Sequence, residues 1–209
     1  MYLSEKRLFV MLKIKFSLVC LSVFFLLGCV NNADNSLSSK AGAPLLKGLG
    51  NHTHKISSNI YGVQRYFDQG LVLAFAFNHA ESIRSFKAAQ KLDPSCAMCF
   101  WGEALALGPN INVNSDGKVI MAPQNRLAAF KAINTAIALS NSISDKERAY
   151  ISALASRYDG NPDTNREPLD IAYANAMEIL SNRYPEDDDA ASLFAEALMN
   201  TMPWNYWAE

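Results

Sequence analysis

Residues 63–107 read VQRYFDQGLVLAFAFNHAESIRSFKAAQKLDPSCAMCFWGEALAL, and this stretch decides the fold class. Apolar side chains recur in it at helical spacing, in two runs that meet near Asn78. Asp93-Pro94 closes the second run. Because proline lacks the amide hydrogen that a continuing helix needs, the second helix is expected to stop there and a third to begin.

Aromatic and small residues in this stretch follow the spacing of a tetratricopeptide repeat, which is 34 residues long. The matching positions are Tyr66, Gly70, Ser82, Phe86, Ala89 and Pro94. Phe100 and Ala104 take the aromatic and small positions of a second unit. Small residues are expected where helices cross closely, with the aromatic rings filling the holes between them. The alternative is an ordinary helical hairpin with an alanine-rich seam.

The rest of the chain continues the helical pattern. Pro123 is typical of a helix first turn, and Ser144 with Glu147 forms a capping box. Three carboxylates at 187–189 favour a helix N-terminus over a metal site. The expected helices are 60–76, 78–92, 97–107, 123–140, 145–158, 168–183 and 188–201. We therefore predict an all-α fold, a tetratricopeptide-like solenoid of stacked helical hairpins.

The N-terminus has the features of an export signal. Basic residues precede an apolar run from Phe16 to Leu27, too short for a typical membrane span. The run ends in LLGC, which resembles a bacterial lipobox and implies lipidation at Cys29; the alternative is an uncleaved anchor. Translation could begin at Met1 or Met11. We expect a signal peptide over 1–28, a tether over 29–56 and a helical repeat domain over 57–209.

Three phrases resemble a family of secreted bacterial tetratricopeptide proteins of unassigned function: YFDQGLVLAFAFNHAESIRSF, LDPSCAMCFWGEALALGPNIN and FAEALMNTMPW. The resemblance runs from about Gly50 to the last residue. It implies an exported protein at the bacterial cell envelope, attached to the membrane by a lipid anchor alone. Relatives in that family continue into further repeats, so this chain is expected to be the front part of a longer protein.

Composition excludes some classes of function. The 19 Lys and Arg residues balance 20 Asp and Glu residues, which leaves no basic surplus for nucleic acid. The sequence contains no nucleophile elbow, phosphate loop, HExxH or dinucleotide fingerprint. We therefore expect a binding protein and not an enzyme, with no required cofactor.

Cys96 and Cys99 lie one turn apart at the expected start of a helix, and three interpretations stay open. They could be a structural pair, disulfide-bonded or simply packed, half of a zinc or copper site, or a redox pair. A metal site needs further ligands, which His52 and His54 could supply if residues 50–56 fold back. His79 is expected too far from the thiols, and instead beside the loop at 108–112.

Stacked hairpins create a groove lined mainly by the first helix of each pair. We expect this groove to bind an apolar helix or an extended peptide of a partner protein, although some of its side chains could instead belong to the core. The candidate lining residues are Gln64, Phe67, Leu71, Phe75, Met98, Trp101 and Leu105.

Overall fold

The computed structural model describes residues 34–112 and 121–202. It divides the chain into two compact units, Met1–Leu45 and Leu46–Glu209. The described part of the first unit is helical over 34–41, so a helix occupies part of the stretch expected to be a tether. The signal segment and Cys29 lie outside the described residues.

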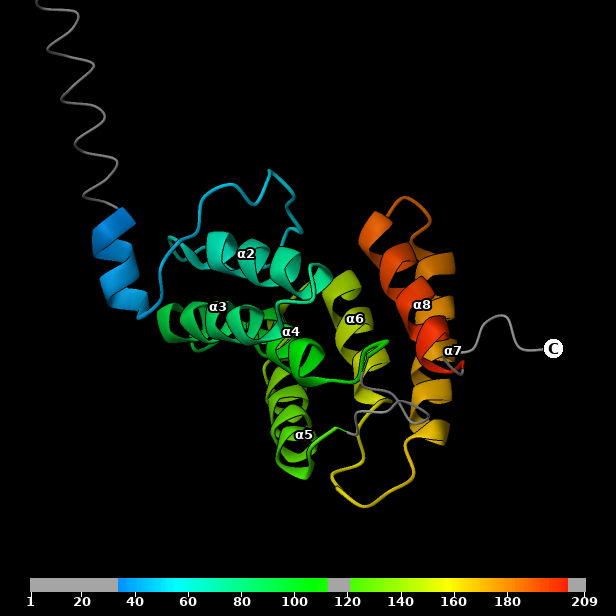
Figure 1. Cartoon of the computed structure of the whole chain (residues 1–209). Helices are drawn as coiled ribbons and strands as arrows, with labels where there is room; N and C mark the ends of the chain where they lie inside the picture. The colour runs from blue at the N-terminus through cyan, green and yellow to red at the C-terminus, as the bar shows by residue number, and fades with distance from the viewer. Residues whose placement is uncertain (1–33, 113–120, 203–209) are drawn as a thin grey trace, which may run out of the picture. The chain divides into compact units, whose positions relative to one another are not determined.

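The second unit is built from helices, and its described residues contain no β-strand, which confirms the all-α class. Figure 1 shows their arrangement along the chain. The helices are α2 (Val63–Phe75), α3 (His79–Leu92), α4 (Ala97–Leu107), α5 (Pro123–Ala138), α6 (Asp145–Ala155), α7 (Glu167–Arg183) and α8 (Asp188–Asn200), with a short 3-10 helix at Ser140–Ser142. None of the helices in the described residues is both long and apolar enough to cross a membrane.

Local signals in the sequence account for the helix ends. Pro123 is in the first turn of α5, as expected. The capping box is present at α6, where Ser144 and Glu147 bond reciprocally. Asp187 caps α8 by accepting a hydrogen bond from the Ala190 amide at 3.3 Å. The prediction that the carboxylates at 187–189 serve a helix N-terminus is confirmed for Asp187.

Each helix packs against the next one in the chain, and α4 also contacts α2 and α6. Aromatic rings connect these three helices: Phe67 of α2 stacks on Trp101 of α4, and Trp101 meets Tyr150 of α6 edge to face. The Trp101 indole also donates to the Tyr150 carbonyl at 3.1 Å. We call the side of the molecule on which α2, α4, α6 and α8 lie the even-helix face. Phe67, Trp101 and Tyr150 are buried beneath it, and Leu193 of α8 lines a cavity together with residues of α2 and α4.

A close helix crossing surrounds Phe86, which is fully buried in α3. A β-carbon added at Gly70 of α2 would lie 2.8 Å from its ring, and one at Gly102 of α4 would lie 2.2 Å from it. The Ser82 hydroxyl also donates to the Gly70 carbonyl at 2.6 Å. The expectation that small residues here permit a close crossing, with Phe86 filling the gap, is confirmed.

A buried ion network joins α6 to α7. Arg157 is fully buried and its Nε lies 3.3 Å from Asp170, which Arg166 also contacts at 2.9 Å. The Arg157 guanidinium lies over the Tyr173 ring at 4.5 Å. Because an unpaired buried charge is very costly, these contacts specify how the last hairpin packs.

Replacing Gly102 with alanine tests the crossing. In an open helix this change would raise the free energy of unfolding by up to about 1 kcal/mol, but the clash with Phe86 should lower it by about 1–3 kcal/mol. In a Phe86→Leu background the same Gly102→Ala change should become neutral or stabilising. Urea unfolding of the four proteins measures this coupling, and simple additivity of the two changes would contradict it.

Candidate functional site

Residues 52–58, which we call the strap, cross the even-helix face as a segment without helix or strand structure. Two side chains of α2 hold its first part. The His54 amide donates to Asp68 Oδ1 at 3.1 Å, and Gln64 Nε2 donates to the His54 carbonyl at 2.9 Å. Gln64 Oε1 also accepts from the Ile56 amide at 3.1 Å. Part of the stretch expected to be a tether therefore belongs to the folded unit.

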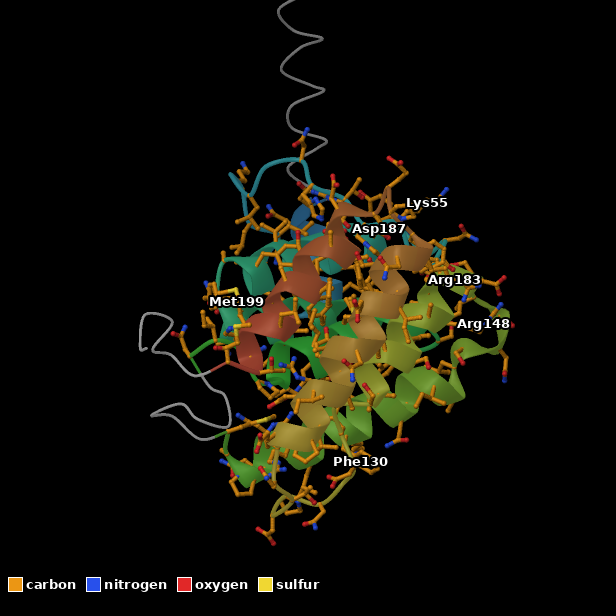
Figure 2. All side chains as sticks on the ribbon, turned by 90° about the vertical axis from the view of Figure 1, so that its right-hand side faces the viewer. Lys55, Phe130, Arg148, Arg183, Asp187 and Met199 are labelled. Carbon is orange, nitrogen blue, oxygen red and sulfur yellow. A yellow bond between two sulfur atoms is a disulfide. The ribbon has the colours of Figure 1, made fainter. Side chains whose placement is uncertain are left out.

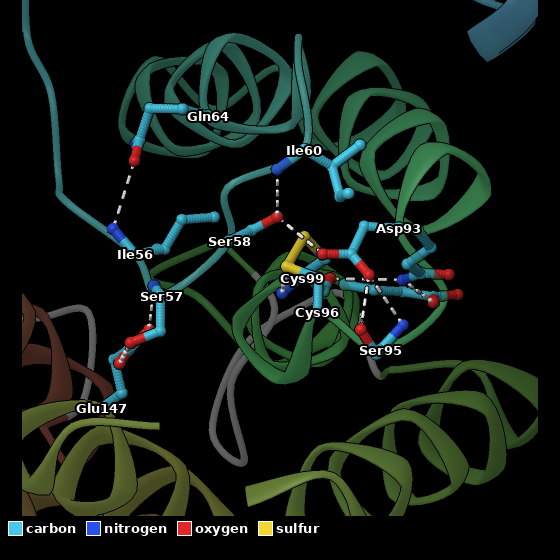
Figure 3. The surroundings of a disulfide bond; sticks show 12 residues. Ile56, Ser57, Ser58, Ile60, Gln64, Asp93, Ser95, Cys96, Cys99 and Glu147 are labelled. Atoms are coloured by element: carbon cyan, nitrogen blue, oxygen red, sulfur yellow. Dashed lines mark hydrogen bonds between the residues drawn. A yellow bond between two sulfur atoms is a disulfide. The ribbon is translucent and has the colours of Figure 1, made fainter. Parts of the chain in front are cut away.

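Two carboxylates hold the end of the strap, as Figure 3 shows. The Ser57 amide donates to Glu147 of α6 at 2.7 Å, and the Ser57 hydroxyl also bonds to this carboxylate. The Ser58 hydroxyl donates to Asp93, just before α4, at 2.6 Å. The strap is thus tied to three separate helical elements.

Glu147 accepts hydrogen bonds from two separate segments of the chain. It completes the capping box of α6 by accepting from the Ser144 amide at 2.9 Å, and it accepts from Ser57 of the strap. Burial alone would raise the pKa of Glu147, but the hydrogen bonds from Ser57 and Ser144 lower it below its ordinary value. The carboxylate is therefore charged at neutral pH.

The strap brings both histidines to the start of α8. His54 Nδ1 lies 2.7 Å from Asp189 Oδ2, and His52 Nε2 lies 3.1 Å from Asp189 Oδ1. His54 is buried, and its ring also meets Tyr150 edge to face. The expected fold-back of residues 50–56 does occur, but it delivers the histidines to a carboxylate and not to the thiols.

Cys96 and Cys99 are joined in a disulfide at the start of α4, with their Cα atoms 5.4 Å apart (Figure 3). Cys96 Sγ also accepts from the Cys99 amide at 3.2 Å, which caps the helix. The expected metal set of Cys96, Cys99, His52 and His54 is therefore corrected: both sulfurs are consumed by their mutual bond, and both imidazoles face Asp189.

The groove candidates separate into three groups. Phe67, Leu71, Met98 and Trp101 are at most 1% exposed and belong to the core. Gln64 is half-buried and holds the strap. Met98 also borders a small cavity beside the strap, whereas Phe75 and Leu105 line an open cavity on the even-helix face. Phe67 is covered by His54 of the strap, and Trp101 by Tyr150 of α6.

This cavity has a volume of about 330 Å³ and lies among α2, α4 and α8. Its lining residues are Ala74, Phe75, Phe77, His79, Leu105, Pro109, Asn110, Ile111, Ser192, Leu193, Ala195, Glu196 and Met199. Figure 2 labels Met199 and Asp187 toward opposite ends of α8. The cavity and the strap therefore use different ends of this helix.

Two titratable side chains border the cavity. His79 Nε2 lies 3.3 Å from the Asn110 amide nitrogen, which confirms the predicted contact with the loop at 108–112. Burial lowers the pKa of His79. Burial also raises the pKa of Glu196, against the opposing charge of Arg157. Each shift is toward the uncharged form of its group, and the other lining side chains are apolar or neutral.

Sequence reasoning missed Asp189, Asp68 and the α8 part of the cavity. The carboxylates at 187–189 predict a helix cap. They do not predict the contact between Asp189 and His54, because these two residues are 135 residues apart in the sequence. No spacing rule connects positions at that separation. Comparison with family models, curated proteins and solved structures finds no match for this chain.

Replacing Glu147 with glutamine should lower the free energy of unfolding by about 1–3 kcal/mol at pH 7, since the capping box and the strap both lose a charged acceptor. The lowered native pKa stabilises the fold above pH 4.5, the ordinary value, and this contribution is lost as pH falls through the native pKa. The deficit of the variant should therefore shrink below pH 4.5. Urea unfolding at several pH values measures it.

Glu178→Gln, at an exposed position of α7, is the matched control for this change. It should leave stability within about 0.5 kcal/mol of the parent. A deficit in Glu147→Gln that stays constant down to pH 3 would contradict the assigned role of this carboxylate.

The disulfide is tested by mass spectrometry of the unreduced protein. The peptide that contains Cys96 and Cys99 should be lighter by two hydrogen atoms. The double variant Cys96→Ser/Cys99→Ala should keep the cap and the small buried residue, yet lose up to about 2 kcal/mol of stability, because the closed loop is short. Two alkylated thiols at these positions in unreduced, exported protein would contradict the bond.

Proposed function

We propose that the chain is a tetratricopeptide-like helical repeat module, anchored by a lipid at Cys29 to the bacterial cell envelope, that binds an apolar peptide segment of a partner protein. Packing of each helix on the next supports the repeat architecture, as does the Gly70–Phe86–Gly102 crossing. The Cys96–Cys99 disulfide supports an oxidising compartment outside the cytoplasm.

The cavity at the C-terminal ends of α2 and α4 carries the binding proposal. Its volume of about 330 Å³ is within the usual range for ligand pockets, which are mostly apolar with a few polar groups. Phe75 is 38% exposed and Met199 is 40% exposed. Large apolar side chains in contact with water at the rim of a hollow are typical of an interaction site.

The strap supports a peptide as the occupant. It shows that the N-terminal half of the even-helix face accepts a non-helical segment, in this case the chain's own. The cavity differs from the strap site because most of its lining side chains are apolar. A charged side chain would therefore lose hydration there without compensation. Apolar or aromatic side chains fit this half best.

A phage-displayed library of random 12-residue peptides, selected on the immobilised full-length protein, tests the proposal. Selected peptides should contain at least two large apolar or aromatic residues. Met199→Glu should weaken their binding at least 10-fold, since it places a charge on the cavity wall. Isothermal titration of a synthetic selected peptide gives the affinity.

Leu127→Glu is the matched control, because Leu127 is 46% exposed on α5 and is not among the cavity-lining residues. It should leave peptide affinity unchanged. Equal loss of binding in both variants, selection of polar peptides, or a preference for small apolar molecules over every peptide would each contradict the proposed function.

A further inference from the structure

The start of α8 gathers three potential metal ligands. One ligand atom each from His54, Asp187 and Asp189 lie within 4.8 Å of one another. His52 adds a second imidazole, with its Nε2 3.1 Å from Asp189 Oδ1. These residues come from the strap and from the first turn of α8, two segments that meet only in the folded protein.

Burial distinguishes this cluster from ordinary surface acids. His54 is 4% exposed and Asp189 is 8% exposed. His54 Nδ1 contacts Asp189 at 2.7 Å, whereas its buried Nε2 has no hydrogen-bond partner among the described residues. Burying an unpaired polar atom is unfavourable, and no hydrogen bond among the described residues uses this nitrogen of a ring that already contacts Asp189.

The charge balance of the cluster favours a bound cation. Asp187 and Asp189 are two carboxylates in one helical turn, and Lys146 Nζ, 2.9 Å from Asp187, supplies one positive charge. Asp187 Oδ1 accepts from the Ala190 amide, and its Oδ2 faces Lys146. Lys146 is 41% exposed, so it can leave this carboxylate for water.

The ligand types identify the class of ion. We propose that His54, Asp187 and Asp189 bind one divalent transition-metal ion of the Zn²⁺ class, with His52 as a further ligand. Imidazole nitrogen and carboxylate oxygen suit Zn²⁺, which commonly takes three protein ligands and one open position. Thiolates take no part, because Cys96 and Cys99 are bonded to each other. This inference does not depend on peptide binding in the cavity.

Metal titration of the untagged, chelator-treated full-length protein tests the site. Equilibrium dialysis should show one Zn²⁺ bound per chain. Co²⁺ should give visible absorption bands of nitrogen and oxygen ligation without the near-ultraviolet band of a thiolate. Asp189→Asn should weaken Zn²⁺ binding at least 10-fold. Asp188→Asn, at the exposed neighbouring position, is the matched control and should bind as the parent does.

Lys146→Met gives a test that does not require loss of a ligand. Removing the competing ammonium should strengthen Zn²⁺ binding severalfold, whereas a purely structural cluster would gain no affinity. If Asp189→Asn fails to fold, Lys146→Met and His52→Ala, with opposite expected effects, decide the question. Substoichiometric binding, a thiolate band, or affinities unchanged by all these substitutions would overturn the site.

Discussion

Hydrogen bonds from the strap to carboxylates of α2 and α6 are the constraint on which the site depends. A segment outside helix and sheet must find other acceptors for its backbone amides. Asp68 and Glu147 provide them for His54 and Ser57. Glu147 also completes a helix cap, so one buried carboxylate stabilises both α6 and the strap. Without the strap, the Glu147 carboxylate would lose its hydrogen bonds from Ser57. The folding of residues 52–58 is therefore coupled to that of the helices.

The helices could be predicted from sequence because their signals are local. Pro123, the Ser144–Glu147 capping box and Asp187 each act within one turn of their helix. The crossing at Phe86 was also predictable, since the repeat spacing places a small residue, Gly70, opposite the ring. These features can be predicted without knowing how successive hairpins are arranged in space. For this reason the helix bounds agree with the expectation to within about three residues at most ends.

The candidate site depends on contacts between residues that are far apart in the sequence, and these contacts were predicted less well than the helices. Phe67 and Trp101 were candidate groove residues, but Tyr150 packs on Trp101 and makes both part of the core. The histidines were paired with the thiols because both were expected on the same side of the layer. The structure instead places Asp189 nearer to them. The spacing of residues along a helix predicts the face on which each side chain lies. It does not predict which of several side chains on that face will be in contact.

The two halves of the even-helix face differ in chemistry, and this difference restricts what each can bind. At one half, carboxylates at helix starts are stabilised by the helix dipole and by amide donors. That half holds backbone amides and imidazoles of the strap. At the other half, Phe75, Leu105 and Met199 surround a cavity whose two titratable neighbours are shifted toward neutrality. An acidic peptide would meet repulsion at the first half and uncompensated desolvation at the second. The selectivity proposed for the face therefore follows from the gathering of Glu147, Asp187 and Asp189 at one half and from the mainly apolar lining of the cavity at the other.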